Sequence, residues 1–71
     1  MDHGEVSFLY HRALHFIRAE FNDRSWEAFW RVAVEGQNPA QVAEDLAMTR
    51  NAVYVAKSRI LYRLREVLGE H

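Results

Sequence analysis

The chain has 71 residues, a net charge of −1 and no cysteine. This length allows one domain with a small core, and the lack of cysteine excludes a disulfide scaffold, a thiolate zinc site and a cysteine nucleophile. The apolar runs are too short to cross a bilayer and no signal peptide is visible, which fits a protein of the reducing cytoplasm with no membrane partner.

The first part of the chain is expected to contain a frayed tail over 1–5 and an amphipathic helix over 6–21. Residues recur there at three- and four-residue steps, and they predict a stripe of Leu9, Ala13, Phe16, Ile17 and either Glu20 or Phe21. His11 and His15 are spaced one helical turn apart, as metal ligands can be. No cysteine or carboxylate stands near them in sequence, so we interpret both as surface residues and expect no metal and no cofactor.

A second helix is predicted over 24–35. The Asn22-Asp23 pair before it is a suitable N-cap, and Gly36 is a suitable stop. Its buried stripe is expected to consist of Trp26, Phe29, Trp30 and Ala33, with Val32 and Val34 at the margins. Two Trp and one Phe exceed what so small a core needs, so we expect one edge of this stripe to stay open.

The remaining sequence predicts a short helix over 39–46 and a long helix that ends at Leu68. Asn38 can cap the short helix, Pro39 suits its first turn, and Gln41 occupies the position from which a capping-box partner reaches back. Thr49 can cap the long helix. The short helix is expected to bury Val42, Ala43 and Leu46. Two helices joined by so short a turn must cross steeply, as in a helix-turn-helix, whose second helix enters the major groove of DNA.

The long helix separates into two faces at 3.6 residues per turn. The apolar face comprises Val53, Ala56, Ile60, Leu64 and Val67, with Leu68 at its edge. The opposite face carries Asn51, Val55, Ser58 and Tyr62, flanked by Tyr54, Arg59 and Arg65. Between Thr49 and Arg65 the chain has five cationic residues and no acid. Arg pairs with guanine, Asn with adenine and Val with the thymine methyl group, while Tyr and Ser bond to phosphate, so this face is typical of a groove-reading helix.

The segment PAQVAEDLAMTRNAVYVAKSRILYRLRE resembles the C-terminal DNA-binding region, region 4, of sigma-70 superfamily transcription initiation factors, especially the extracytoplasmic-function (ECF) group. The matching positions are Gln41, Val42, Ala43, Leu46, Met48, Thr49, Val53, Arg59, Leu64 and Arg65. The segment RSWEAFWRVAVEG resembles the preceding helix of that region. Ala47 departs from the family, which usually has Gly there, and a left-handed alanine would be strained by roughly 1 kcal/mol. Ala52 and Tyr54 replace the commoner Thr and basic residue, so the family's base preference is not carried over.

The resemblance implies an all-α fold, a four-helix, bundle-like domain over 6–68 that ends in a helix-turn-helix without a wing, followed by a tail over 69–71. It also implies binding to the −35 promoter element as duplex DNA, while the domain is held on the flap of the RNA polymerase β subunit. An anti-sigma protein is a further partner that it implies. A full sigma factor also has a promoter-melting domain, so we expect this chain to be a part of a longer protein.

The candidate site residues fall into two groups. The base-edge or groove candidates are Asn51, Tyr54, Val55, Ser58 and Arg59. The phosphate candidates are Arg50, Tyr62, Arg63 and Arg65. Because the net charge is close to zero, we expect the free domain to bind DNA weakly and to need tethering.

Three other functions compete with this interpretation. An enzyme, and with it a small-molecule substrate, is not expected, because the sequence has no Gly-rich phosphate loop, no Ser-His-Asp set and no metal-ligand cluster. A helical protein-interaction domain would use the Trp-rich helix alone and would not bind DNA. A helix-turn-helix effector domain of another regulator, such as a response regulator, would share the fold but act as a dimer on operators.

Overall fold

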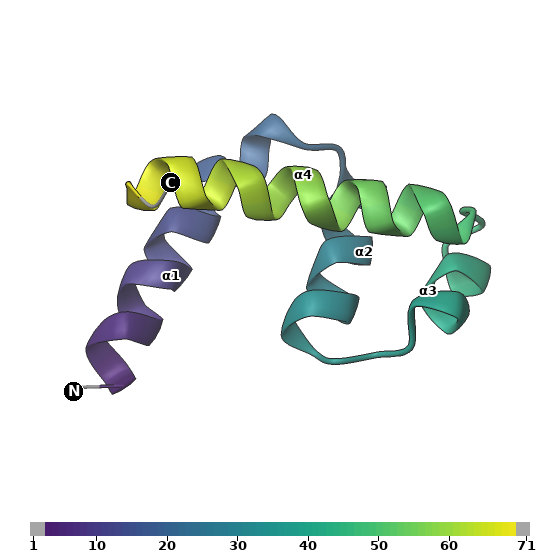
Figure 1. Ribbon diagram of the computed structural model, residues 1–71, viewed down its shortest axis with the longest axis horizontal. Coiled ribbons are helices and arrows are strands. Elements are labelled where there is room, and N and C mark those ends of the chain that lie inside the picture. Colours follow the sequence, from purple (N-terminus) through teal and green to yellow (C-terminus); the bar gives the residue numbers. More distant parts are fainter. Residues whose placement is uncertain (1–2, 70–71) are drawn as a thin grey trace.

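The computed structural model describes residues 3–69, and within them every regular element is helical (Figure 1). The fold is therefore all-α with four α-helices, as predicted. They are α1 (His3–Ile17), α2 (Asp23–Phe29), α3 (Pro39–Asp45) and α4 (Arg50–Leu68). A 3₁₀ turn, η1 (Arg18–Glu20), follows α1, and a π-helical turn, η2 (Trp30–Val34), follows α2. Of the expected tails, residues 1–2 and 70–71 lie outside the described residues, and α1 begins three residues before the expected helix start at Val6.

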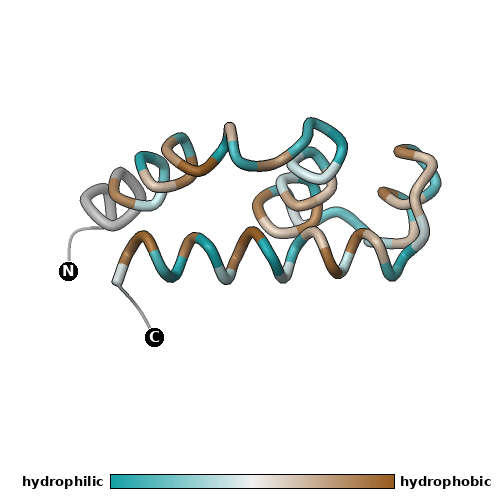
Figure 2. The backbone as a smooth tube through the Cα atoms, turned by 90° about the horizontal axis from the view of Figure 1, so that it is seen from above, coloured by the Kyte–Doolittle hydropathy of each residue, from teal (hydrophilic) through white to brown (hydrophobic). Residues whose placement is uncertain are grey.

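The long helix α4 is the element against which the other three pack (Figure 1). Along it, α1 contacts the C-terminal part, α2 the middle and α3 the N-terminal end (Figures 1 and 2). Residues 46–49 join α3 to α4, and both views show α3 lying across the end of α4 and not alongside it. The two helices thus form the helix-turn-helix pair that the sequence predicts. None of the described helices is long and apolar enough to cross a membrane.

Local sequence signals fix where these helices begin. The Asn22 carboxamide oxygen accepts from Ser25 N at 2.8 Å and caps α2. The Asn38 carboxamide oxygen accepts from Ala40 N at 2.8 Å and caps α3, while the Thr49 hydroxyl oxygen accepts from Ala52 N at 3.0 Å and caps α4. All three predicted caps are confirmed.

The capping-box role expected for Gln41 is wrong. Its Nε2 donates to Asp45 Oδ1 at 2.9 Å, one turn further along α3, and does not reach back toward Asn38. In a capping box the Gln41 side-chain oxygen would accept from the Asn38 backbone N–H, whereas here the amide group donates to a charged carboxylate, and such charge-assisted hydrogen bonds are the stronger ones.

The core has two halves that meet in α2. In the first, α1 and the C-terminal half of α4 pack against α2; its buried residues are Ala13, Leu14, Ile17, Phe29, Ile60 and Leu64. In the second, α3 and the N-terminal half of α4 do so; its buried residues are Ala28, Val42, Ala43, Val53 and Ala56. The adjacent residues Ala28 and Phe29 therefore serve different halves. The apolar stripe predicted for α4 is confirmed, with Val67 and Leu68 half-buried at its end (Figure 2).

Two residues predicted to lie in the core of α1 are on the surface. Phe16 is 68% exposed and Leu9 is 51% exposed, while Leu14, absent from the predicted stripe, is buried. Only one side of α1 meets α4, so a narrow stripe of Ala13, Leu14 and Ile17 is covered and the apolar residues beside it are not. Of the two alternatives for the last position of the stripe, Phe21 is half-buried against the core and Glu20 is exposed.

The π turn explains a second difference, in the Trp-rich helix. Ala33 is exposed, contrary to prediction, whereas Ala28 is completely buried. The i→i+5 bond from Glu35 N to Trp30 O, at 3.0 Å, widens the helix. Positions after Trp30 therefore no longer follow the 3.6-residue period from which the stripe was predicted. Val34 is also exposed, and only Val32 packs against the core.

The turn between α3 and α4 contains the strained residue that the sequence predicts. Ala47 has φ of 55°, in the left-handed region where a Cβ is unfavourable. Gly36, which ends η2 with φ of 68°, occupies the same region without that cost.

Replacing Ala47 with Gly should therefore stabilise the domain, raising the free energy of unfolding by about 0.5–1 kcal/mol. Gly36→Ala is the matched control of opposite sign: no atom lies within 4 Å of the added Cβ, so only backbone strain acts. It should cost about 1 kcal/mol. Urea denaturation of both variants measures this. Equal stability of Ala47→Gly and the parent chain would show that the turn relaxes in solution.

Candidate nucleic-acid interface

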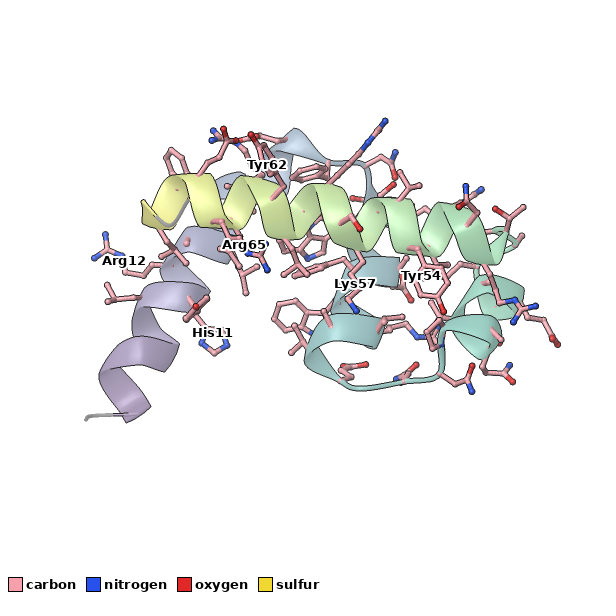
Figure 3. The ribbon with its side chains drawn as sticks, in the orientation of Figure 1. His11, Arg12, Tyr54, Lys57, Tyr62 and Arg65 are labelled. Carbon is pink, nitrogen blue, oxygen red and sulfur yellow. The ribbon has the colours of Figure 1, made fainter. Side chains whose placement is uncertain are left out.

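The polar face of α4 is open to solvent along its length. Tyr62 is 66% exposed, Tyr54 50% and Val55 39%, and the rest of the face is exposed with them, namely Arg50, Asn51, Ser58, Arg59 and Arg65. In Figure 3 the side chains of Tyr54, Lys57 and Arg65 extend from one side of α4 and Tyr62 from the other. All nine candidate residues except the half-buried Arg63 are therefore exposed.

This surface is also unusually free of compensating charge. Arg50, Arg59 and Arg65 make no ion pair with any residue that the structure describes, and α4 has no acid before Glu66. Exposed arginines beside Tyr, Ser, Asn and Val form a surface that can bond to phosphates and base edges alike.

Arg63 differs from the other phosphate candidates. Its Nε donates to Glu20 Oε1 at 2.7 Å and its Nη2 to Glu20 Oε2 at 3.1 Å, and Glu66 approaches at 3.7 Å. The hydrogen bond from Arg63 holds the pKa of the Glu20 carboxyl below its usual value. The guanidinium is thus engaged with η1, 43 positions away in sequence. The phosphate role of Arg63 stays a prediction, and it requires that this pair open.

A second ion-pair cluster fixes α3, the first helix of the helix-turn-helix. Arg31 Nη2 lies 2.6 Å from Asp45 Oδ2, its Nε donates to Gln37 Oε1 at 2.7 Å, and Glu27 lies 3.8 Å away. The bonds from Arg31 and then Gln41 keep the pKa of Asp45 below its usual value. This Arg31 cluster ties η2 to the far end of α3. The sequence analysis missed it, because nothing in the local sequence pairs Arg31 with Asp45.

The Trp-rich helix keeps an open edge, as expected. The Trp26 and Trp30 rings stack at a centroid distance of 6.4 Å, and both remain half-exposed. The Arg18 guanidinium lies 5.3 Å from the Trp26 ring centroid and pairs with Asp23 Oδ1 at 2.7 Å. A hollow between α1 and α2 is lined by Trp26, Trp30 and Arg18 together with His11, Leu14 and His15. We call it the Trp hollow.

The described residues contain no group of three or more His, Cys, Asp or Glu side chains that could hold a metal. His11 and His15 are exposed on α1, at the rim of the Trp hollow.

Arg24 and Ser25 line a separate shallow pocket with Thr49 at the start of α4.

No family model, no curated protein and no solved structure matches this chain. The function proposed below therefore rests on the side chains, their geometry and the sequence resemblance described above.

Acid should destabilise the domain through the paired carboxylates. Glu20 and Asp45 have lowered pKa values in the folded protein, so the unfolded chain takes up their protons first. Their contribution is complete above the unfolded pKa values and is lost as the pH falls below about 5. In urea denaturation over a pH series, Glu20→Gln should show a shallower loss of stability than the parent. Glu44→Gln, a control carboxylate with no ion pair in the described part of the chain, should follow the parent.

Parallel curves for the parent, Glu20→Gln and Glu44→Gln would mean that the Glu20–Arg63 pair does not persist in solution.

Proposed function

We propose that this chain is a sequence-specific DNA-binding domain of the sigma-70 superfamily, equivalent to region 4 of an ECF-type factor. It would bind the −35 promoter element as duplex DNA and direct RNA polymerase, in the cytoplasm, to initiate transcription. The observation that carries the proposal is the exposed polar face of α4, whose arginines next to Asn51, Val55 and Ser58 make no ion pair with a described residue. A solvated helix face has no need of Val55 and two tyrosines, whereas a groove-reading face uses them.

The helix-turn-helix geometry supports the same assignment. With α4 in the major groove, α3 would cross the DNA backbone, and the exposed residues Gln37 and Asn38 at its start would approach phosphates. The Arg31 cluster would keep α3 at a fixed angle to α4, so that backbone and base contacts are made together. Asn51, Tyr54, Val55, Ser58 and Arg59 would contact base edges or the groove, and Arg50, Tyr62, Arg63 and Arg65 would contact phosphates.

The Trp hollow would hold the protein partner. Two half-exposed indoles offer apolar contact area, and Arg18, His11 and His15 surround it with basic groups. By the proposed family membership this partner is the flap of the RNA polymerase β subunit, and an anti-sigma protein would compete for the domain. Tethering at the Trp hollow would compensate for the weak DNA binding expected from a net charge of −1.

The same hollow favours a second candidate function, a helical protein-interaction domain without DNA binding. The two functions differ in one measurable property. A DNA-binding domain selects a common sequence from a pool of random duplexes at low salt, and its affinity falls steeply as salt rises. If the purified chain enriches no sequence and retains no duplex, the interaction-only function is correct and the promoter-binding proposal fails.

Arg59→Ala should change which duplexes bind. Losing a bidentate contact to guanine should reduce discrimination at one base position by roughly 1–3 kcal/mol. Arg65→Ala is the matched control on the opposite flank of the same polar face: it should weaken binding to every duplex alike and lower the salt slope by about one. Competition binding with duplexes that differ at single positions measures both effects. A uniform loss of affinity in Arg59→Ala would remove it from base readout.

Trp30→Ala should weaken binding to a purified β-flap domain by about 2 kcal/mol, as expected for an aromatic anchor, and leave the DNA salt slope unchanged. Phe16→Ala removes a more exposed aromatic ring, on the other side of α1, and should bind the flap like the parent chain. Calorimetric titration of both variants tests this. Equal losses in the two variants would place the flap elsewhere on the domain.

A further inference from the structure

Glu20 is an acid placed beside the basic face of α4. It ends η1, and with Phe21 and Asn22 it lines one wall of a cleft whose other wall includes Val55 and Arg59. Arg63 stands one helical turn beyond Arg59 on the same flank of α4. At 1.5 Å per residue it lies about 20 Å along the helix from Arg50. A duplex bound to α4 would bring a phosphate backbone past this flank.

The Glu20–Arg63 pair occupies the donors that a phosphate would use. Both carboxylate oxygens accept from Arg63, at 2.7 and 3.1 Å, in the forked arrangement in which arginine also binds phosphate. The two side chains are 40% and 36% exposed, so solvent and anions reach them. Exposed ion pairs contribute little to stability, so a phosphate could replace the carboxylate at small cost. The pair's larger effect is therefore on what Arg63 can bind.

We propose that Glu20 competes with DNA phosphate for Arg63 and thereby limits the affinity that does not depend on base sequence. The inference rests on the proposed function, since it needs a duplex on α4. Phosphate contacts raise affinity for all sequences equally, whereas base contacts raise it for one. By occupying Arg63, Glu20 removes one phosphate contact and leaves base readout as the larger share of the binding free energy.

Glu20→Gln removes the charge and keeps the shape, and it should expose this effect in a binding titration. Affinity should rise for a selected duplex and for a scrambled duplex by the same factor, and the salt slope should steepen by about one. The advantage over the parent should shrink about threefold between 50 and 200 mM salt. Glu35→Gln makes the same change in net charge at the end of η2, outside this cleft, and should match the parent.

The Arg63→Ala background isolates the pair. There Glu20→Gln should leave the salt slope unchanged, because no guanidinium remains to be released. Circular dichroism establishes that each variant is helical, and Glu20→Asp, which keeps the charge but shortens the reach, is a second variant if Glu20→Gln unfolds. Glu20→Asp should also steepen the salt dependence of DNA binding, because the shorter side chain cannot form the forked pair with Arg63.

The outcomes separate two failures. If the parent binds duplexes but Glu20→Gln has the same affinity and slope, Glu20 does not restrain Arg63 and this inference is overturned. The inference is equally overturned if Glu20→Gln steepens the slope in the Arg63→Ala background as well, since the gain is then general electrostatics. If the parent binds no duplex under any salt condition, the proposed function itself fails.

Discussion

The structure depends on the burial of one side of α4. Val53 and Ile60 are completely buried, and three short helices that could not be stable alone converge on this stripe. Each such side chain contributes roughly 1.5–3 kcal/mol when it leaves water, so in a chain this short the stripe supplies a large share of the stability. Because the other helices contact α4 through this stripe, the opposite face of α4 stays exposed to solvent.

Charge is distributed in keeping with that division. The acids near the basic helix are matched to particular arginines: Asp23 to Arg18, Asp45 to Arg31 and Glu20 to Arg63. Each pair links two elements: η1 to α2, η2 to α3 and η1 to α4. The remaining arginines of α4 make no ion pair with a described residue, so their field is directed outward. A near-neutral chain thereby acquires one basic surface, and this local field determines what the domain attracts.

The sequence predicts well those features that depend on residues within one or two helical turns of each other. Asn22, Asn38 and Thr49 act as caps, Ala47 is left-handed, and the α4 stripe follows its 3.6-residue period. Tertiary contacts could not be predicted in this way. Periodicity does not tell which flank of α1 meets α4, so it predicts Phe16 in the core and omits Leu14. The π turn, and pairs such as Arg63 with Glu20, have no local signature. Exposure of the candidate face follows from its polar residues, and it is confirmed for every candidate residue but the half-buried Arg63.

The central claim is that the open face of α4 lies against a DNA duplex. Amide NMR spectra of the labelled chain, recorded at low salt with and without a duplex selected from a random pool, test it most directly. The account predicts shifts at Asn51, Val55, Ser58 and Arg59 and at the start of α3, with little change around Trp26 and Trp30. Spectra that do not change, or changes confined to the Trp hollow, would contradict it.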